Sequence, residues 1–103
     1  MKPDNFISPD YFKLDDLLTE EHKLVRDTSR SWVKKNISPI IEKNAQEATF
    51  PKEILPGLAE IGAFGCFIPQ EYGGAEMDYI SYGLMMQELE RGDSGIRSTA
   101  SVQ

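Results

Sequence analysis

The residues of this sequence that could take part in chemistry are few, and most of them stand alone. Cys66 is the only cysteine and His22 the only histidine, and they lie far apart in the chain. A paired Cys–His nucleophile is therefore not indicated, and Cys66 is interpreted as a buried structural thiol. No Cys, His and Asp spacing is typical of a metal site. Asp93 and Arg97 are four residues apart, which on a helix usually gives an exposed ion pair worth only ~0.3–0.5 kcal/mol.

The composition narrows the classes of partner. The chain has 103 residues, enough for one domain, and a net charge of −6 with no cluster of basic residues. Because phosphate binding depends on Lys and Arg clusters, we expect no nucleic-acid partner. No apolar run approaches the ~20 residues of a membrane span, so no membrane partner is expected either. The first residues resemble neither a signal nor a transit peptide, which favours a bacterial cytoplasmic protein, or a mitochondrial matrix protein if the source is eukaryotic.

The elements that must position these residues are predicted to be helices. Residues 1–18 form a polar and aromatic leader arm, expected to be extended or turned, with its aromatic and leucine side chains packed onto the domain of residues 19–103. Thr19 is a suitable N-cap for a helix over residues 20–36. The apolar stripe predicted for that helix recurs at three- and four-residue spacing. It comprises Leu24, Val25, Thr28, Trp32, Val33, Asn36 and Ile37.

Two shorter helices are predicted next. Pro39 marks a break, after which residues 40–48 carry a second helix with Ile and Ala on its apolar face. Pro51 suits the first turn of a third helix. Pro56 falls inside that helix and is expected to bend it, and Gly62 is the expected stop.

A fourth helix over residues 79–91 and a fifth from residue 94 complete the pattern. Asp78 and Asp93 are the expected N-caps. The fourth helix is apolar or small nearly all round, so part of its surface is expected to face a partner. The fifth reads as helix to Gln103 without a stop signal, and we expect the chain to be a fragment. The predicted fold class is all-α, with four main helices and a partial fifth.

Several segments together resemble the acyl-CoA dehydrogenase family, over about residues 14–103. The turn with the pattern Pro-x-Glu-Tyr-Gly-Gly, which starts at Pro69, is the most specific of them. The segments are Leu18-Thr19-Glu20-Glu21, Phe50-Pro51-Lys52-Glu53-Ile54, Leu58-Ala59-Glu60-Ile61-Gly62, Ile68-Pro69-Gln70-Glu71-Tyr72-Gly73-Gly74 and Glu88-Leu89-Glu90-Arg91. The last segment continues through Gly92-Asp93-Ser94-Gly95-Ile96-Arg97-Ser98, and in this stretch the chain is most similar to glutaryl-CoA dehydrogenases.

The resemblance implies substrate-binding residues. In glutaryl-CoA dehydrogenases an arginine, the serine after it and an upstream glutamate contact the distal carboxylate of the glutaryl chain, and these correspond to Arg97, Ser98 and Glu90. The chemistry agrees, because a planar guanidinium can bind a carboxylate through two donors and a neighbouring hydroxyl adds a third. Glu90 would orient the arginine. The resemblance assigns no catalytic residue to this chain.

The resemblance also implies the rest of the protein. The family joins this helical domain to a middle β domain and a carboxy-terminal helical bundle, binds FAD and passes electrons to the electron-transferring flavoprotein. The catalytic base and nearly all flavin contacts are expected beyond Gln103, so this chain alone is expected to be inactive and without FAD, and its parent to be a homotetramer. Two alternatives stay open: a short- or branched-chain acyl-CoA dehydrogenase, and a stand-alone helical module that binds a protein partner.

Overall fold

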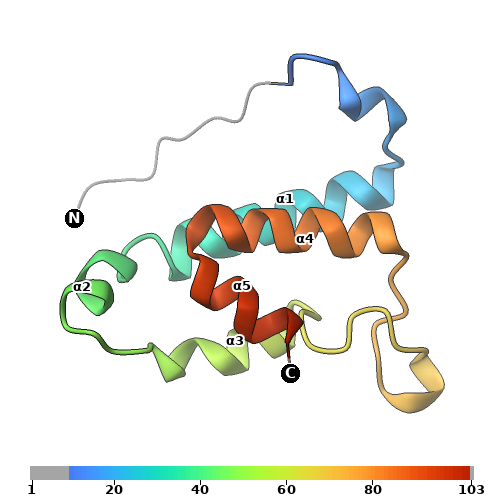
Figure 1. The fold of residues 1–103 in the computed structure, drawn as a ribbon. Coiled ribbons are helices and arrows are strands. Elements are labelled where there is room, and N and C mark those ends of the chain that lie inside the picture. The colour runs from blue at the N-terminus through green and yellow to red at the C-terminus, as the bar shows by residue number, and fades with distance from the viewer. Residues whose placement is uncertain (1–9, 103) are drawn as a thin grey trace.

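The computed structural model describes residues 10–102 and contains five α-helices joined by turns (Figure 1). The α-helices are α1 (Glu20–Asn36), α2 (Ile41–Gln46), α3 (Leu55–Glu60), α4 (Tyr79–Gly92) and α5 (Ser94–Ser101). Three short 3₁₀ turns accompany them, η1 (Leu14–Leu17), η2 (Lys52–Ile54) and η3 (Gln70–Tyr72). No strand occurs within residues 10–102, so the predicted all-α fold is confirmed.

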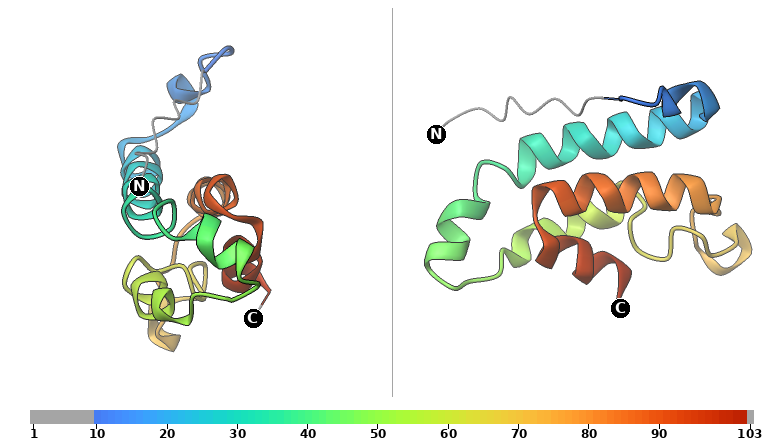
Figure 2. Two further views of the ribbon diagram at one scale, coloured as in Figure 1. Left: turned by 90° about the vertical axis from the view of Figure 1, so that its left-hand side faces the viewer. Right: turned by 45° about the horizontal axis from the view of Figure 1, so that its top comes forward.

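The two longest helices form the centre of the domain. α1 and α4 lie side by side and run in the same direction, while α3 and α5 lie on one side of the pair (Figures 1 and 2). All four contribute to one apolar core. Its buried members are Val33, Ile37, Ile54, Leu58, Ala63, Met85, Met86, Leu89, Ile96 and Ala100.

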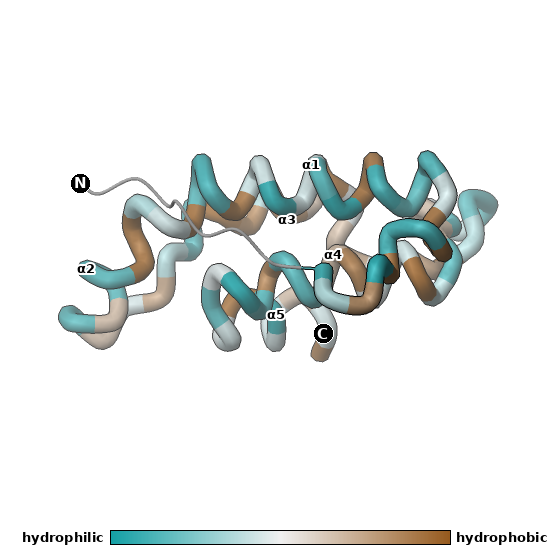
Figure 3. The backbone as a smooth tube through the Cα atoms, turned by 90° about the horizontal axis from the view of Figure 1, so that it is seen from above, coloured by the Kyte–Doolittle hydropathy of each residue, from teal (hydrophilic) through white to brown (hydrophobic). Residues whose placement is uncertain are grey.

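The apolar stripe of α1 is rotated from the predicted one. The buried positions are His22, Ser29, Val33 and Ile37, whereas Leu24 is 67% exposed. The hydrophilic positions of α1 lie mostly on its outer edge, away from α4 (Figure 3). The prediction was wrong for Leu24 and Thr28, which are both exposed, because the buried face of α1 includes the polar residues His22 and Ser29, which the predicted stripe left out.

The helix caps follow the predicted chemistry. Thr19 accepts the backbone N–H of His22 at 3.2 Å, and Asp78 accepts that of Ser81 at 2.7 Å. Gly62 has a φ of +81° after α3, where the backbone N–H groups of residues 62 and 63 close a C-terminal capping motif on α3. These local signals therefore place the starts of α1 and α4 and the end of α3 as predicted.

His22 has a structural role that the sequence did not indicate. Its Nδ1 accepts the backbone N–H of Thr19 at 3.1 Å, and its Nε2 lies 2.8 Å from Oδ2 of Asp78. An imidazole whose Nδ1 accepts carries its proton on Nε2, so Nε2–H donates to the aspartate. One buried side chain thus joins the N-terminal caps of α1 and α4.

Two expectations for the third helix were wrong. Pro51 precedes η2 instead of opening an α-helix, and α3 begins only at Leu55. Pro56 therefore lies in the first turn, where a backbone N–H has no intrahelical partner, and it does not bend the helix from within.

The ends of the chain also differ from expectation. Tyr11 and Phe12 are about 86% and 85% exposed and Leu17 is 76% exposed, so these side chains do not pack onto the domain; Phe6 lies outside the described residues. The backbone of the arm forms a short turn, one of its two expected forms, because the Asp10 carboxylate accepts the N–H groups of Leu14 and Asp15 at the start of η1. At the other end α5 ends at Ser101. Among residues 10–102 no helix is long and apolar enough to cross a membrane.

Candidate functional site

The predicted binding residues lie at the corner between α4 and α5. Asp93 adopts an extended conformation between the two helices, and its carboxylate accepts the backbone N–H of Ile96 at 3.0 Å, which starts α5. Ile96 and Ala100 are buried in the core and hold α5 against α4. Because α5 turns back along α4, Arg97 lies beside Glu90, which is seven residues earlier in the chain.

Glu90 and Arg97 form an ion pair at this corner. Nε of Arg97 donates to Oε2 of Glu90 at 2.9 Å, so the two residues meet as the orienting role of Glu90 requires. Asp93, by contrast, caps α5 with its carboxylate and makes no ion pair with Arg97. The alternative of an exposed Asp93–Arg97 pair was therefore wrong, because the N-cap role takes the carboxylate away from the arginine.

Two further serines contact this ion pair. The Ser94 hydroxyl donates to Oε1 of Glu90 at 2.7 Å, and Nη1 of Arg97 donates to the Ser101 hydroxyl at 3.2 Å. The sequence analysis missed both. The available signal was their spacing, because each serine is four residues after the charged residue that it contacts, and such residues share one helix face when the helix continues.

Ser98 does not join these contacts. It follows Arg97 on α5 and is half-buried, and its carbonyl accepts the backbone N–H of Val102 at 2.9 Å near the end of the helix. No hydrogen bond of its hydroxyl is seen within residues 10–102. The structure thus brings together two of the three predicted residues and places the third beside them on the same helix.

The electrostatics of the corner favour an ionised pair. The Ser94 hydroxyl, and secondly the Arg97 guanidinium, hold the pKa of Glu90 below its ordinary value. A guanidinium has five N–H donors, of which Glu90 and Ser101 take one each. The Arg97 side chain is 34% exposed, and its remaining donors have no acceptor in the part of the chain that the structure describes. The arrangement can bind an anion through the end of the guanidinium.

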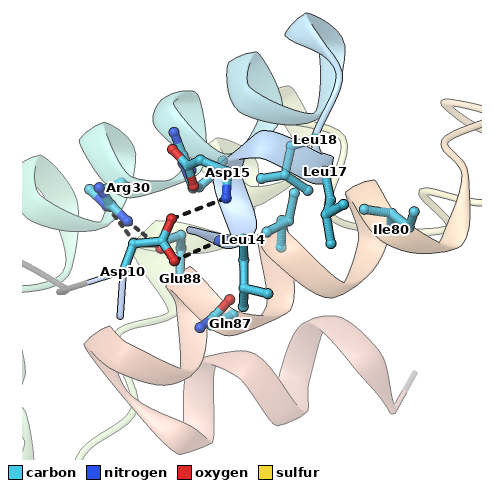
Figure 4. A pocket seen from close by; sticks show the side chains of 11 residues that line it. Asp10, Leu14, Asp15, Leu17, Leu18, Arg30, Ile80, Gln87 and Glu88 are labelled. Atoms are coloured by element: carbon cyan, nitrogen blue, oxygen red, sulfur yellow. Dashed lines mark hydrogen bonds and ion pairs between the residues drawn. The ribbon is translucent and has the colours of Figure 1, made fainter. Parts of the chain in front are cut away.

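A groove of about 450 Å³ lies elsewhere, between η1, α1 and α4 (Figure 4). Leucines of the arm and Ile80 of α4 line one part of it, while Arg30 and Glu88 line another. Nε and Nη2 of Arg30 donate to the two carboxylate oxygens of Glu88, both at 3.0 Å, and Arg91 donates to Glu88 at 3.3 Å. The Glu88 carboxylate is thus paired with Arg30 and Arg91. The Glu90–Arg97 pair does not line this groove.

The described residues show no site for a metal or for the phosphates of a cofactor. No group of three or more His, Cys, Asp or Glu side chains among residues 10–102 could hold a metal ion. The N-termini of the three longest helices could attract phosphate. Each of them is occupied by its own cap, the side chains of Thr19, Asp78 and Asp93.

Comparison with known proteins gives a consistent result. Residues 19–103 match the family model described as acyl-CoA dehydrogenase, N-terminal domain. The fold is similar to a glutaryl-CoA dehydrogenase from Mycobacterium smegmatis in complex with FADH2, with a TM-score of 0.83 and 36% identity over 87% of this chain and 23% of that one. In sequence, the chain is 41% identical over 73 residues to a 3-(aryl)acrylate reductase of Clostridium sporogenes, covering 71% of this chain and 19% of the relative. It is 33% identical to the mitochondrial short-chain specific acyl-CoA dehydrogenase of Bos taurus, covering 73% and 18% of the two chains. The chain spans about a fifth of the length of these relatives.

Proposed function

Since this chain belongs to the acyl-CoA dehydrogenase family, in which residues 19–103 match the amino-terminal domain, we propose that its full-length parent is an FAD-dependent acyl-CoA dehydrogenase acting on glutaryl-CoA. The parent would oxidise the Cα–Cβ bond of glutaryl-CoA and release the distal carboxyl group as carbon dioxide, giving crotonyl-CoA. The part of the reaction assigned to this chain is recognition of the distal carboxylate.

The observation that carries the proposal is the Glu90–Arg97 ion pair with its remaining guanidinium donors. Glu90 holds Nε of Arg97, while Nη2 and one N–H of Nη1 stay available for an incoming carboxylate. Ser98, half-buried on the same helix, would supply a further donor from its hydroxyl. An arginine suits this role better than a lysine because its planar fork matches the two oxygens of a carboxylate.

The remaining parts of the reaction are proposed for segments outside this chain. FAD is the oxidant of the family, and we place its site and the catalytic base in the other domains of the parent, because residues 19–103 match only the amino-terminal domain of that family. The 103-residue chain is then inactive by itself. The electron-transferring flavoprotein is the proposed electron acceptor and a tetramer the proposed assembly. The proposed location is the cytoplasm of a bacterium or the mitochondrial matrix.

A second candidate is a short- or branched-chain acyl-CoA dehydrogenase, whose substrate has no distal carboxylate. The similarity to the short-chain specific enzyme of Bos taurus supports it. In that case the Glu90–Arg97 pair would serve only to join α4 and α5. The third candidate, a stand-alone helical interaction module, is the least supported, since the match over residues 19–103 is to one domain of an enzyme family.

Arg97→Met in the parent enzyme separates these candidates. If Arg97 binds the distal carboxylate, kcat/KM for glutaryl-CoA should fall roughly ten- to hundredfold, since a hydrogen-bonded charge pair contributes ~1.5–3 kcal/mol. The value for butyryl-CoA, which has no carboxylate, should change little. Arg26→Met is the matched control, because Arg26 pairs with Asp15 beside the groove between η1, α1 and α4, which the Glu90–Arg97 pair does not line. An equal change for both substrates after Arg97→Met would favour the short-chain candidate.

A further inference from the structure

The Arg97 guanidinium is held at two points by two different helices. Glu90 of α4 binds Nε, and Ser101 of α5, one turn beyond Arg97, accepts from Nη1 at 3.2 Å. The two acceptors bind different nitrogens of the planar group. Glu90 is itself held by Ser94 at 2.7 Å. The arginine is therefore at the centre of a short chain of hydrogen bonds that begins and ends on serine hydroxyls.

The two hydrogen bonds together fix the orientation of the Arg97 guanidinium, which one bond alone would not do. With Nε alone bound, the guanidinium plane can still rotate about the Nε–H···O direction, and ordering a long arginine side chain costs rotamer entropy. A second bond at Nη1 stops that rotation. The free edge, formed by Nη2 and the second N–H of Nη1, then points in one direction before any ligand arrives.

We propose that Ser101 is a positioning residue for the distal carboxylate of the acyl chain: its hydroxyl fixes the Arg97 guanidinium so that the free edge faces the ligand. This inference rests on the proposed function, since it takes Arg97 as the carboxylate-binding group. Ser101 has no role in the proposed function as stated above. Ser101 acts through Arg97 and does not itself have to touch the substrate.

The test uses the full-length holoenzyme with glutaryl-CoA and butyryl-CoA as paired substrates. Ser101→Ala should raise KM for glutaryl-CoA by about three- to tenfold, less than Arg97→Met, because the lost hydrogen bond acts on the ligand only through Arg97. Kinetic constants for butyryl-CoA should stay as they were. Ser101→Thr keeps the hydroxyl and should restore most of the discrimination between the two substrates.

A matched control is available on the same helix. The Thr99 hydroxyl donates to the Gly95 carbonyl at 2.9 Å and does not touch the ion pair. Thr99→Ser keeps that hydroxyl, and Thr99→Ala removes it. Neither change should alter the ratio of KM values, because the guanidinium keeps both of its contacts.

The outcomes separate this inference from the proposed function. If Arg97→Met lowers the preference for glutaryl-CoA and Ser101→Ala does not, Arg97 binds the carboxylate but Ser101 does not position it, and the inference is wrong. Equal losses for both substrates in Ser101→Ala would also overturn it, since they would indicate a purely structural serine. If even Arg97→Met leaves the preference unchanged, the proposed function fails, and the inference fails with it.

Discussion

Replacing Glu88 by glutamine tests whether a buried ion pair fixes α1 against α4. The Glu88 side chain is only 4% exposed, and three N–H groups of Arg30 and Arg91 donate to it. Glutamine keeps the size and one acceptor oxygen but removes the charge, and its NH₂ group would face a guanidinium donor. Two cations would then remain beside a neutral amide in a largely dry site.

The expected loss follows from these contacts. Breaking a fully buried pair costs ~3–5 kcal/mol. The Arg30 side chain is about one-third exposed, however, so water can solvate its charge again once the partner is lost. The bond from Arg91, at 3.3 Å, is also long. We therefore expect Glu88→Gln to lower the free energy of unfolding by about 2–3 kcal/mol.

Urea denaturation of this chain, followed by far-ultraviolet circular dichroism, measures that loss. Glu53→Gln makes the same chemical change at an exposed position of η2 and should shift the free energy of unfolding by less than about 0.5 kcal/mol. A loss for Glu88→Gln as small as that of the control would refute the reasoning. It would mean that the pair is solvated as a surface pair is, and that apolar packing alone holds α1 and α4 together.

Two other changes have defined outcomes. In Gly92→Ala the new Cβ would lie 2.6 Å from Cγ1 of Val33, so we expect a loss of about 1–2 kcal/mol in urea denaturation. The same glycine substitution made in a Val33→Ala background should cost much less than in the unchanged protein, because the clashing methyl group is absent. The backbone N–H of Ser81, and secondly His22, lower the pKa of Asp78 from 3.8 to about 2. Because the folded-state pKa is the lower one, the stability that the carboxylate contributes is complete above about pH 4 and is lost as the pH falls toward 2. Asp78→Asn should therefore be less stable at neutral pH and lose less stability over that acid range; equal acid dependence of the two proteins would contradict the assignment.

The elements of this fold were predictable where their signals are local. Thr19, Asp78 and Gly62 act through hydrogen bonds to their own helix ends, so the residue type and its position in the sequence were sufficient. The face of α1 was predicted less well. Its buried positions include His22 and Ser29, and a polar residue is recognised as buried only when its partner on another helix is known.

The candidate site was also predicted only in part from the sequence. Glu90 and Arg97 were identified from a resemblance, and the ion pair between them agrees with the role given to Glu90. Ser94 and Ser101 were missed because the pattern of relatives named Ser98 alone. The spacing of Arg97 and Ser101 on one helix was a usable signal. The contact between Ser94 and Glu90 instead crosses the corner between α4 and α5, where spacing along the chain does not fix side-chain directions.

The corner between α4 and α5 obtains its geometry from contacts at some distance from it. Glu88 and Gly92 fix α4 against α1, one through charges and the other through close approach of the backbone to Val33. Ile96 fixes α5 against the same core. Glu90 and Arg97 lie on the outer side of these anchored turns, so their own ion pair is not needed to hold the two helices together. Glu88→Gln should therefore lower the free energy of unfolding. Substitutions of Arg97 or Ser101 should instead alter the binding of a carboxylate and change the free energy of unfolding little. This separation is what allows substrate preference and folding to be measured as independent effects in the same protein.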